Sequence, residues 1–429
     1  MFHQEFSIQN LPDSLADFKQ KALQWADSFH QIAYYESNQI SFPHSGFQNF
    51  LGVSNTFLPI NLNQPLDSLQ KAAQDAKQVL CCLLSYELKN NIETLSSRNP
   101  DKLQFPKVHY FHPEIQIHFT TAAIIIQSLA DNCGEIFRAV SEQYISASIS
   151  SAKINLEAQI PKEVYISQVK KIKERIWEGD VYELNYCQEF HAAVSEFNPI
   201  TAFAKLNQLS PMPFAGLYKL HDRYLLCASP ERFLKKEGNR LVAQPIKGTI
   251  RRGHSDLEDA QLKKQLATDE KEIAENMMIM DLMRNDLARC SLTGSVKVEE
   301  MFCIYQFRQV YQMITTIVSR IAPTTTLSEI LRCTFPMGSM TGAPKIQALR
   351  LIDEYEAFAR GLYAGSMGYI YPNGDFDFNV VIRSMQYNRA AGYLSCAVGS
   401  AITYDSDPEK EYQECLLKAE AIVKVLQAT

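Results

Sequence analysis

Strand-like and helix-like segments come in separate blocks along this chain, and they do not alternate one for one as βαβ units would. "VLCCLLSYEL" (79–88) and "EIQIHFTTAAIII" (114–126) each have the pattern of a strand, the second alternating at first and then becoming continuously apolar. A long helical stretch without Gly or Pro covers about 255–290. This arrangement predicts an α+β fold with mainly antiparallel sheets.

The composition narrows the class of protein. The 429 residues are enough for two domains or one large composite domain. Hydrophobic residues make up 46% and charged residues 21%, which is typical of a soluble globular protein. The net charge of −6 argues against a nucleic acid as the main partner. The longest apolar runs fall far short of the ~20 residues of a membrane span, so no membrane partner is expected.

The N-terminus and the cysteines indicate a compartment. The first residues contain neither a basic n-region nor an apolar h-region, so we expect no signal peptide. The ten cysteines form no CxxC pair and show no regular spacing. Without an export signal they are expected to be reduced and mostly buried thiols. The sequence therefore predicts a cytoplasmic protein.

The chain divides at a stretch rich in Ser and Ala. Residues 141–152 are predicted to link an N-terminal portion, 1–150, to the remainder, 161–427. From 161 onward, apolar residues recur at helical spacing until Gly179, a typical C-terminal stop. "RYLLCASPERFLKKEGNRLVAQPI" (223–246) has the pattern of two short strands joined by a Gly-Asn turn.

A terminal helix is predicted from Asp407 to Gln427. Asp407 is a good N-cap, and Pro408 suits the first helical turn. The apolar residues at helical spacing predict which face is buried. This stripe consists of Tyr412, Leu416, Ala419, Val423 and Leu426.

A second face of the same helix carries Glu411, Glu414 and Lys418, which project together. Taken alone, such a face indicates a solvated charged surface. The preceding apolar strand and the turn at Gly399, however, deliver it to the edge of a sheet. A further acidic candidate is Glu275, in another helical segment. Glutamates paired across two helices suit Mg²⁺, a hard cation that often shares its shell with an anionic substrate.

Two other segments contribute candidate anion ligands. "FPMGSMTGAPKIQAL" (335–349) lacks the adjacent Gly-Lys-Ser/Thr of a phosphate loop. Pro344 in it suits a helix start, whose free N–H groups can bind a carboxylate, although a tight turn alone fits this segment equally well. Tyr363 and Arg383, each more often structural, form with Lys418 a set able to hold carboxylates.

Six segments, in this order, resemble the chorismate-utilising enzymes, a family that includes anthranilate synthase component I, aminodeoxychorismate synthase component I, isochorismate synthase and salicylate synthase. They are "ASPERF", "PIKGTIRRG", "AENMMIMDLMRNDLARC", "GSMTGAPKIQALRLIDEYE", "RGLYAGSMGYI" and "VGSAITYDSDPEKEYQECLLKAEAI". The resemblance covers roughly 161–427 as a catalytic domain, and 1–150 more faintly as the N-terminal portion. It implies antiparallel sheets packed in a sandwich with outer helices.

The resemblance also implies roles for individual residues. Mg²⁺ would be held against the ring carboxylate of chorismate by Glu275, Glu411 and Glu414. The substrate, including its enolpyruvyl carboxylate, would be bound by Tyr363, Arg383, Lys418, Ser339 and backbone near Gly399. Glu231 would be the general acid that protonates the departing 4-hydroxyl, which requires a raised pKa.

Lys247 in "PIKGT" separates members of the family. The aminodeoxychorismate synthase branch carries this lysine, whereas anthranilate synthases carry a small residue there. The resemblance implies that Lys247 adds to C2 of the ring and that ammonia then displaces it by attack at C4. Desolvation, together with Arg251 and Arg252, is expected to lower the pKa of Lys247 and so free its amine.

Two further positions refine the comparison with the family. Glu183 stands where isochorismate and salicylate synthases carry a lysine that activates water at C2, which argues against C2 hydroxylation. Gln312 stands where the family usually has a histidine, and an amide can replace its hydrogen bond but not its proton exchange.

The favoured function is amination of chorismate to 4-amino-4-deoxychorismate, which belongs to para-aminobenzoate and folate synthesis. Chorismate, ammonia and a glutaminase (glutamine amidotransferase) subunit are then the expected partners. The alternatives are anthranilate synthase component I of tryptophan synthesis and a catalytically inactive chorismate-binding regulator. The intact set Glu231, Glu275, Glu414 and Lys418 argues against the inactive regulator.

Overall fold

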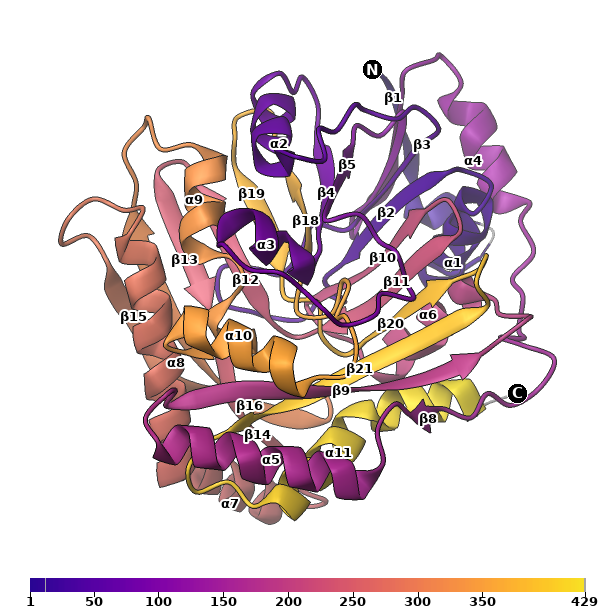
Figure 1. Cartoon of the computed structure of the whole chain (residues 1–429). Helices are drawn as coiled ribbons and strands as arrows, with labels where there is room; N and C mark the ends of the chain where they lie inside the picture. The colour runs from indigo at the N-terminus through magenta and orange to yellow at the C-terminus, as the bar shows by residue number, and fades with distance from the viewer. Residues whose placement is uncertain (12, 428–429) are drawn as a thin grey trace.

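The computed structural model describes residues 1–11 and 13–427, whose strands form two antiparallel sheets (Figure 1). Twelve described strands form the first sheet: β1 (Phe2–Ser7), β2 (Gln31–Glu36), β3 (Phe50–Ser54), β6 (Ile115–Phe119), β7 (Ala123–Ser128), β8 (Glu157–Ala158), β9 (Glu183–Ala193), β10 (Phe214–Leu220), β11 (Arg223–Ser229), β17 (Gly342–Ala343), β20 (Ser384–Asn388) and β21 (Tyr393–Ile402). Nine form the second: β4 (Leu80–Leu84), β5 (Val108–Phe111), β12 (Arg232–Glu237), β13 (Arg240–Gln244), β14 (Ile246–Arg251), β15 (Lys297–Gln306), β16 (Val310–Arg320), β18 (Ser366–Ile370) and β19 (Phe376–Asn379). The predicted α+β class is confirmed.

Both sheets combine strands from the two ends of the chain. In the first sheet, the order β1-β7-β6-β3-β2 continues directly into β10-β11-β20-β21-β9-β17. In the second, β18 pairs with β4, placing Gly368 opposite Cys82. The portions 1–150 and 161–427 are therefore joined by continuous backbone hydrogen bonding.

Helices cover the outer faces of the sheets (Figure 1). They are α1 (Leu15–Ala26), α2 (Pro65–Gln74), α3 (Lys89–Ile92), α4 (Cys133–Ser141), α5 (Lys162–Trp177), α6 (Pro199–Leu209), α7 (Asp256–Ala267), α8 (Glu270–Ala288), α9 (Leu327–Thr334), α10 (Lys345–Tyr355) and α11 (Pro408–Gln427), with short 3₁₀ turns η1 (Ile8–Asn10), η2 (Tyr86–Leu88) and η3 (Gly338–Met340). Helix α11 packs on β21 and α5, whereas α8 packs on β14 and β16.

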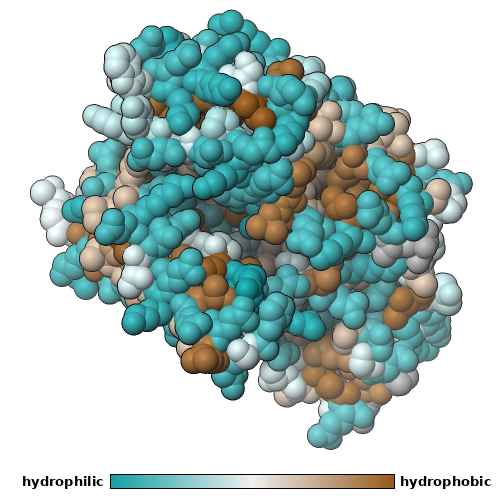
Figure 2. All heavy atoms as spheres, turned by 90° about the horizontal axis from the view of Figure 1, so that it is seen from below, coloured by the Kyte–Doolittle hydropathy of each residue, from teal (hydrophilic) through white to brown (hydrophobic). Residues whose placement is uncertain are grey.

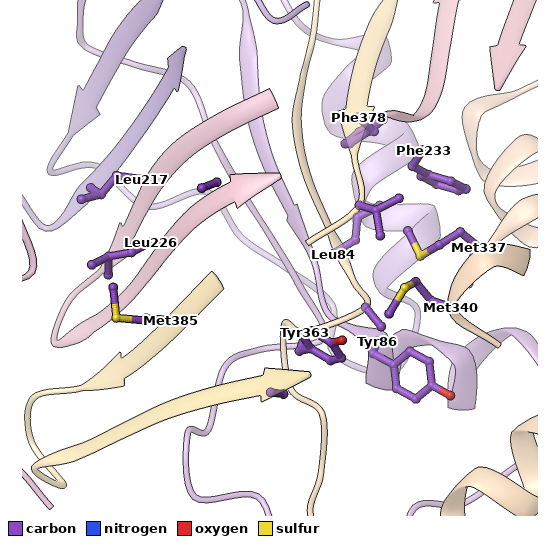
Figure 3. Packing of buried hydrophobic residues seen from close by; sticks show 14 of the residues in the cluster. Leu84, Tyr86, Leu217, Leu226, Phe233, Met337, Met340, Tyr363, Phe378 and Met385 are labelled. Carbon is purple, nitrogen blue, oxygen red and sulfur yellow. The ribbon is translucent and has the colours of Figure 1, made fainter. Parts of the chain in front are cut away.

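The largest hydrophobic cluster packs under the helices, and a second, which contains Tyr35 of β2 and Tyr369 of β18, lies between the two sheets. Figure 3 shows Leu84 and Tyr86, from the N-terminal portion, in one cluster with Phe233, Met340 and Phe378. All five side chains are buried. Burial of apolar area contributes about 25 cal/mol per Å², so this shared core stabilises the two portions together.

The surface is predominantly polar on the face seen in Figure 2, where hydrophobic side chains gather only in separate small groups. In the part of the chain described here, no helix has the length and apolar character needed to cross a membrane. The ten cysteines all lie within this part, are free, and are mostly buried, as expected.

Several predicted elements are divided in the structure. The predicted strand 114–126 is a hairpin of β6 and β7, because Thr120 accepts hydrogen bonds from the backbone of Ala122 and Ala123 and closes a turn. The predicted helix 255–290 is two helices, α7 and α8. Asp269 begins the second by accepting a bond from the Glu272 N–H, a capping geometry that ends one helix and starts another.

The segment 223–246 contains three strands instead of two. The predicted Gly-Asn turn joins β12 to β13, but the preceding strand β11 belongs to the other sheet. The terminal helix has the predicted bounds, and Tyr412, Ala419 and Leu426 of its predicted stripe are buried, but the rest of the stripe is rotated. Cys415, Ile422 and Val425 face the core, whereas Leu416 is exposed and Val423 is only partly buried. The rotation also buries Glu411, which polarity alone would place outside.

Candidate active site

Lys247 lies where the two sheets approach each other. It belongs to β14, at one edge of the second sheet, while Glu183 begins β9 of the first. The Lys247 Nζ is 3.3 Å from Glu183 Oε1, and their side chains are 13% and 1% exposed. The pair therefore joins the sheets through a charged contact that is largely shielded from water.

A bulge in β14 presents Lys247. Ile246 pairs with Ile314 and Thr249 with Gln312, so Lys247 and Gly248 together face a single residue of β16. Gly248 has a φ of +94°, a conformation that side-chain-bearing residues rarely adopt. The glycine after the lysine is thus required by the local backbone.

Asn276 of α8 holds this bulge in place. Its amide Nδ2 donates to the carbonyls of Lys247 at 3.1 Å and Met313 at 3.3 Å. Its Oδ1 accepts from the Thr315 hydroxyl at 2.6 Å. Asn276 was not among the predicted residues, although it directly follows Glu275 and is the one amide within a largely apolar turn.

We expect Asn276→Ala to lower the free energy of unfolding by ~2 kcal/mol or more, because the Lys247 and Met313 carbonyls and the Thr315 hydroxyl each lose a partner, at about 1–3 kcal/mol per lost bond. Urea denaturation against Asn285→Ala measures this. Asn285 is exposed on the same helix, so its substitution should cost no more than about 0.5 kcal/mol. Equal urea midpoints for the two variants would show that the hydrogen bonds of Asn276 do not contribute to stability.

The predicted cause of lysine activation is wrong. Burial lowers the pKa of Lys247, but the carboxylates of Glu183 and Glu275 raise it by more, so the net pKa lies above the ordinary value. Arg251 and Arg252 do not oppose this effect. They bind Glu258 at 2.5 Å and Asp259 at 2.6 Å, since both carboxylates stand in the first turn of the adjacent α7. Without substrate, Lys247 is charged.

Glu231 has the properties expected of an acid near neutral pH. It lies in the link between β11 and β12, is 4% exposed, and accepts a 2.6 Å bond from the Ser339 hydroxyl of η3. Burial raises its pKa to about 7, against the lowering effects of Ser339 and Lys247. The structure thus brings Glu231, Ser339 and Lys247 into one site.

Acidic side chains from α8 and α11 meet near Lys247. Lys271 Nζ lies 3.6 Å from Glu275 and 4.0 Å from Glu411, so these carboxylates are neighbours across two helices. Burial raises the pKa of Glu272 to about 7, and Glu275 and Glu414 add to the rise. Glu272 was not among the predicted residues, although it lies one helical turn before Glu275.

These carboxylates have the chemistry needed for a hard cation. The described residues contain no ready-made group of three metal-ligand side chains. One oxygen of Glu275 is nevertheless buried without a hydrogen-bond partner. That oxygen lies 3.6 Å from the half-exposed Lys271 ammonium and makes no hydrogen bond to it, so it can serve as a ligand for Mg²⁺. The residues predicted to bind it therefore fit such an ion, and the ion itself stays a prediction.

A cationic group, consisting of Arg383 and Lys418, lies beside Glu414 of the acidic set. Lys418 donates to the Gly399 carbonyl at 2.7 Å and pairs with Glu414 at 2.6 Å. Within the described residues, the Arg383 guanidinium makes no hydrogen bond or ion pair, and burial lowers its pKa. An arginine without a partner at a partly buried position is suited to an anionic ligand.

Tyr363 and Gly399 complete the predicted set. Tyr363 is buried and lies in the cluster of Met340 and Tyr86 (Figure 3). Burial raises the pKa of its hydroxyl, and the nearby Arg383 opposes this rise. A Cβ at Gly399 would collide with Cys187 and with the Tyr186 carbonyl, so β21 can approach β9 this closely only with glycine there. Tyr363 and Gly399 are thereby placed near the cationic group.

Gln312 lies in β16 opposite Thr249, next to the lysine bulge. Its side chain is buried, and its Oε1 has no partner among the described residues. Its expected equivalence to a substrate-facing histidine stays a prediction, as does the consequence of an amide there.

Comparison with known proteins places this geometry in a family. Residues 17–424 match the family described as chorismate binding enzyme. Aminodeoxychorismate synthase component 1 from Escherichia coli (strain K12) is 36% identical over 287 residues, which cover 67% of this chain and 63% of that protein. The match thus spans less than two thirds of that relative's length.

Other relatives carry a different name. Anthranilate synthase component 1 from Thermus thermophilus is 30% identical over 354 residues, covering 80% of this chain and 76% of that protein. The crystal structure of anthranilate synthase component I from Streptococcus pneumoniae TIGR4 has a TM-score of 0.75 at 26% identity, covering 88% of this chain and 89% of that one. Because the family match extends over strands of both sheets and every residue of the site, this chain belongs to the chorismate-binding enzyme family.

Proposed function

We propose that this enzyme replaces the 4-hydroxyl of chorismate with an amino group and forms 4-amino-4-deoxychorismate. The observation that carries the proposal is Lys247 on its glycine bulge, shielded from water beside a buried acid of suitable pKa, Glu231. The relative named aminodeoxychorismate synthase component 1 supports the same choice of reaction.

In this proposal the cationic group binds the substrate. Arg383 and Lys418 supply positive charge for the carboxylates of chorismate, and the Tyr363 hydroxyl supplies a donor. Lys418 is already oriented by the Gly399 carbonyl, so little of its side-chain freedom remains to be lost on binding. The two carboxylates of the substrate require this positive charge, because Glu275 and Glu414 already place negative charge near Lys247.

Magnesium would be held by Glu275, Glu411 and Glu414. When bound, a divalent cation would neutralise these carboxylates and attract the ring carboxylate. Lys271 contacts Glu275 and Glu411 with a half-exposed side chain. Such a side chain is able to turn toward solvent when another cation takes its place.

The reaction itself uses Lys247 and Glu231. The neutral amine of Lys247 adds to C2, the ring double bonds shift, and the C4–oxygen bond breaks. Glu231 gives its proton to the departing hydroxyl, which leaves as water. Ammonia then attacks C4, the double bonds shift back, and the C2–nitrogen bond breaks to release Lys247.

A second candidate is anthranilate synthesis, because the Thermus thermophilus relative of that name matches 80% of this chain. Incubation with chorismate, Mg²⁺ and an ammonium salt, followed by chromatography and mass analysis, separates the two. The expected product is 4-amino-4-deoxychorismate. Anthranilate with pyruvate would assign the second function, and an absence of any product would indicate an inactive chorismate-binding protein.

Lys247→Ala should divert the reaction as well as slow it. The substitution leaves C2 open, so ammonia can attack there and give the 2-amino isomer or anthranilate. Glu231 still protonates the leaving hydroxyl, so the loss of total turnover should be partial. The same product assay measures this, and a variant with the wild-type rate and only the 4-amino product would make Lys247 a bystander.

The chain should use ammonia directly and should need a separate glutaminase subunit to use glutamine. None of its ten cysteines lies in a Gly-x-Cys-x-Gly frame typical of a nucleophile turn. Product formation with equal concentrations of ammonium or glutamine measures the difference. Steady turnover of glutamine by the purified chain would refute the proposal of a partner subunit.

A further inference from the structure

We propose that Glu183 is the base that removes a proton from Lys247, so that the lysine becomes a nucleophile only when the site is in use. This inference rests on the proposed function, in which Lys247 attacks the substrate. It assigns a catalytic role to a residue whose identity otherwise only argues against C2 hydroxylation.

The geometry selects Glu183 as the proton acceptor. Its Oε1 is 3.3 Å from Lys247 Nζ, and its Oε2 is buried without a hydrogen-bond partner in the described structure. Backbone pairing on both sides fixes its position, since Ala343 pairs with Glu183 and Ile402 with Leu184. A buried carboxylate with one unpartnered oxygen has a high affinity for a proton, and burial raises the pKa of Glu183.

The other carboxylates near Lys247 are unsuited to this step. Glu231 must keep its own proton for the leaving hydroxyl. Glu275 and Glu414 are the predicted Mg²⁺ ligands, and a cation at that place would remove their affinity for protons. Of the acidic side chains that the structure describes, Glu183 alone is within 4.0 Å of the Lys247 Nζ.

The proton balance closes over one turnover. The Lys247 ammonium gives one proton to Glu183 and becomes a neutral amine, which forms the bond to C2. When ammonia attacks C4, Lys247 leaves C2 with the electron pair as a neutral amine. Glu183 then returns the proton, which restores the ion pair. Glu231, which lost its proton to water, is protonated again by the ammonium ions that supply the ammonia.

Glu183 has two effects on Lys247, and they oppose each other in a variant. As an anion it raises the pKa of Lys247, so Glu183→Gln should leave more of the amine neutral. As a base it accepts the proton during attack, which glutamine cannot do. A residue that acts only as a charge clamp would therefore make the reaction faster when it is removed, whereas a base would make it slower.

The test compares two reactions of Lys247 in the whole protein. In the first, a small amine-acylating reagent without substrate labels the lysine, and peptide mass analysis gives the rate. In the second, chorismate is added without ammonia, the reaction is quenched at short times, and mass spectrometry measures how much adduct has formed. We expect Glu183→Gln to label faster than wild type and to form the adduct about 10²–10⁴-fold more slowly. Glu183→Asp, which keeps the carboxylate, should recover part of the adduct rate.

Glu189→Gln is the matched control. Glu189 is a buried carboxyl on the same strand, but it accepts hydrogen bonds from the hydroxyls of Ser395 and Tyr393 and does not contact Lys247. Both of its rates should equal those of wild type. Adduct formation by Glu183→Gln at the wild-type rate or faster would overturn the inference while leaving the proposed function intact. If wild type itself forms neither adduct nor 4-amino product, the proposed function fails and the inference fails with it.

Discussion

Glu231→Gln is expected to lower turnover of chorismate by about 10²–10⁴-fold, because the 4-hydroxyl then departs without a proton donor. The amide keeps the size and the hydrogen bond with Ser339, so the fold should survive. Steady-state assays with saturating ammonium measure the loss. A variant with more than about a tenth of the wild-type rate would exclude Glu231 as the general acid.

The pH dependence of Glu231 provides a second readout. Its pKa of about 7 means that the acid form declines as the pH rises above 7, so turnover should fall on the alkaline side. Ser339→Ala removes a bond that lowers this pKa, and the fall should shift to higher pH. An unchanged profile in Ser339→Ala would assign the alkaline fall to another group.

The same pKa predicts a change in stability. The folded protein holds the Glu231 proton more tightly than the unfolded chain does, because the pKa rises from 4.5 to about 7. This contribution is fully present below about pH 4.5 and is lost as the pH rises through 7. Glutamine carries no charge, so Glu231→Gln should have a higher thermal midpoint than wild type at pH 8. A lower midpoint at pH 8 would contradict the direction.

Glu414→Gln is expected to abolish turnover while the fold survives, since losing one carboxylate at a hard-cation site removes most of the binding. Calorimetric titration with Mg²⁺ measures the metal directly, and the product assay measures the consequence. Glu420→Gln is the matched control. Glu420 pairs with Lys424 at the same helical spacing as Glu414 with Lys418, but on an exposed face.

The control should bind Mg²⁺ and turn over chorismate like wild type, because an exposed ion pair of this kind contributes only about 0.3–0.5 kcal/mol. Full activity of Glu414→Gln in chelator-treated buffer would contradict the metal site. A loss of activity with unchanged Mg²⁺ binding would place Glu414 in substrate binding through Lys418 instead.

Sequence patterns predicted the terminal helix and the segments that form the site, because helix caps and helical periodicity depend on local residues. Asp407 accepts bonds from the first backbone N–H groups of α11, as its position predicted. The buried stripe was only partly predicted, since Glu411 and Cys415 are also buried by neighbouring elements, which periodicity alone does not reveal. Tertiary packing thus determined the rotation of the helix.

The electrostatics of Lys247 could not be read from the chain. Nearness in sequence suggested that Arg251 and Arg252 act on it, yet both pair with carboxylates in the first turn of α7. Glu183, far earlier in the sequence, becomes the ion-pair partner only when the two sheets meet. Likewise, the role of Asn276 depends on the bulge that it spans, and the bulge exists only in the paired strands.

In the proposed mechanism, Lys247 becomes covalently bonded to the substrate during turnover. Intact-protein mass spectrometry measures this directly, on wild-type protein that has been mixed with chorismate in the absence of ammonia and quenched with acid. We expect an added mass equal to chorismate less one water, located on the Lys247 peptide, and no such mass in Lys247→Ala. An unmodified wild-type chain under conditions in which added ammonium restores formation of the 4-amino product would contradict it.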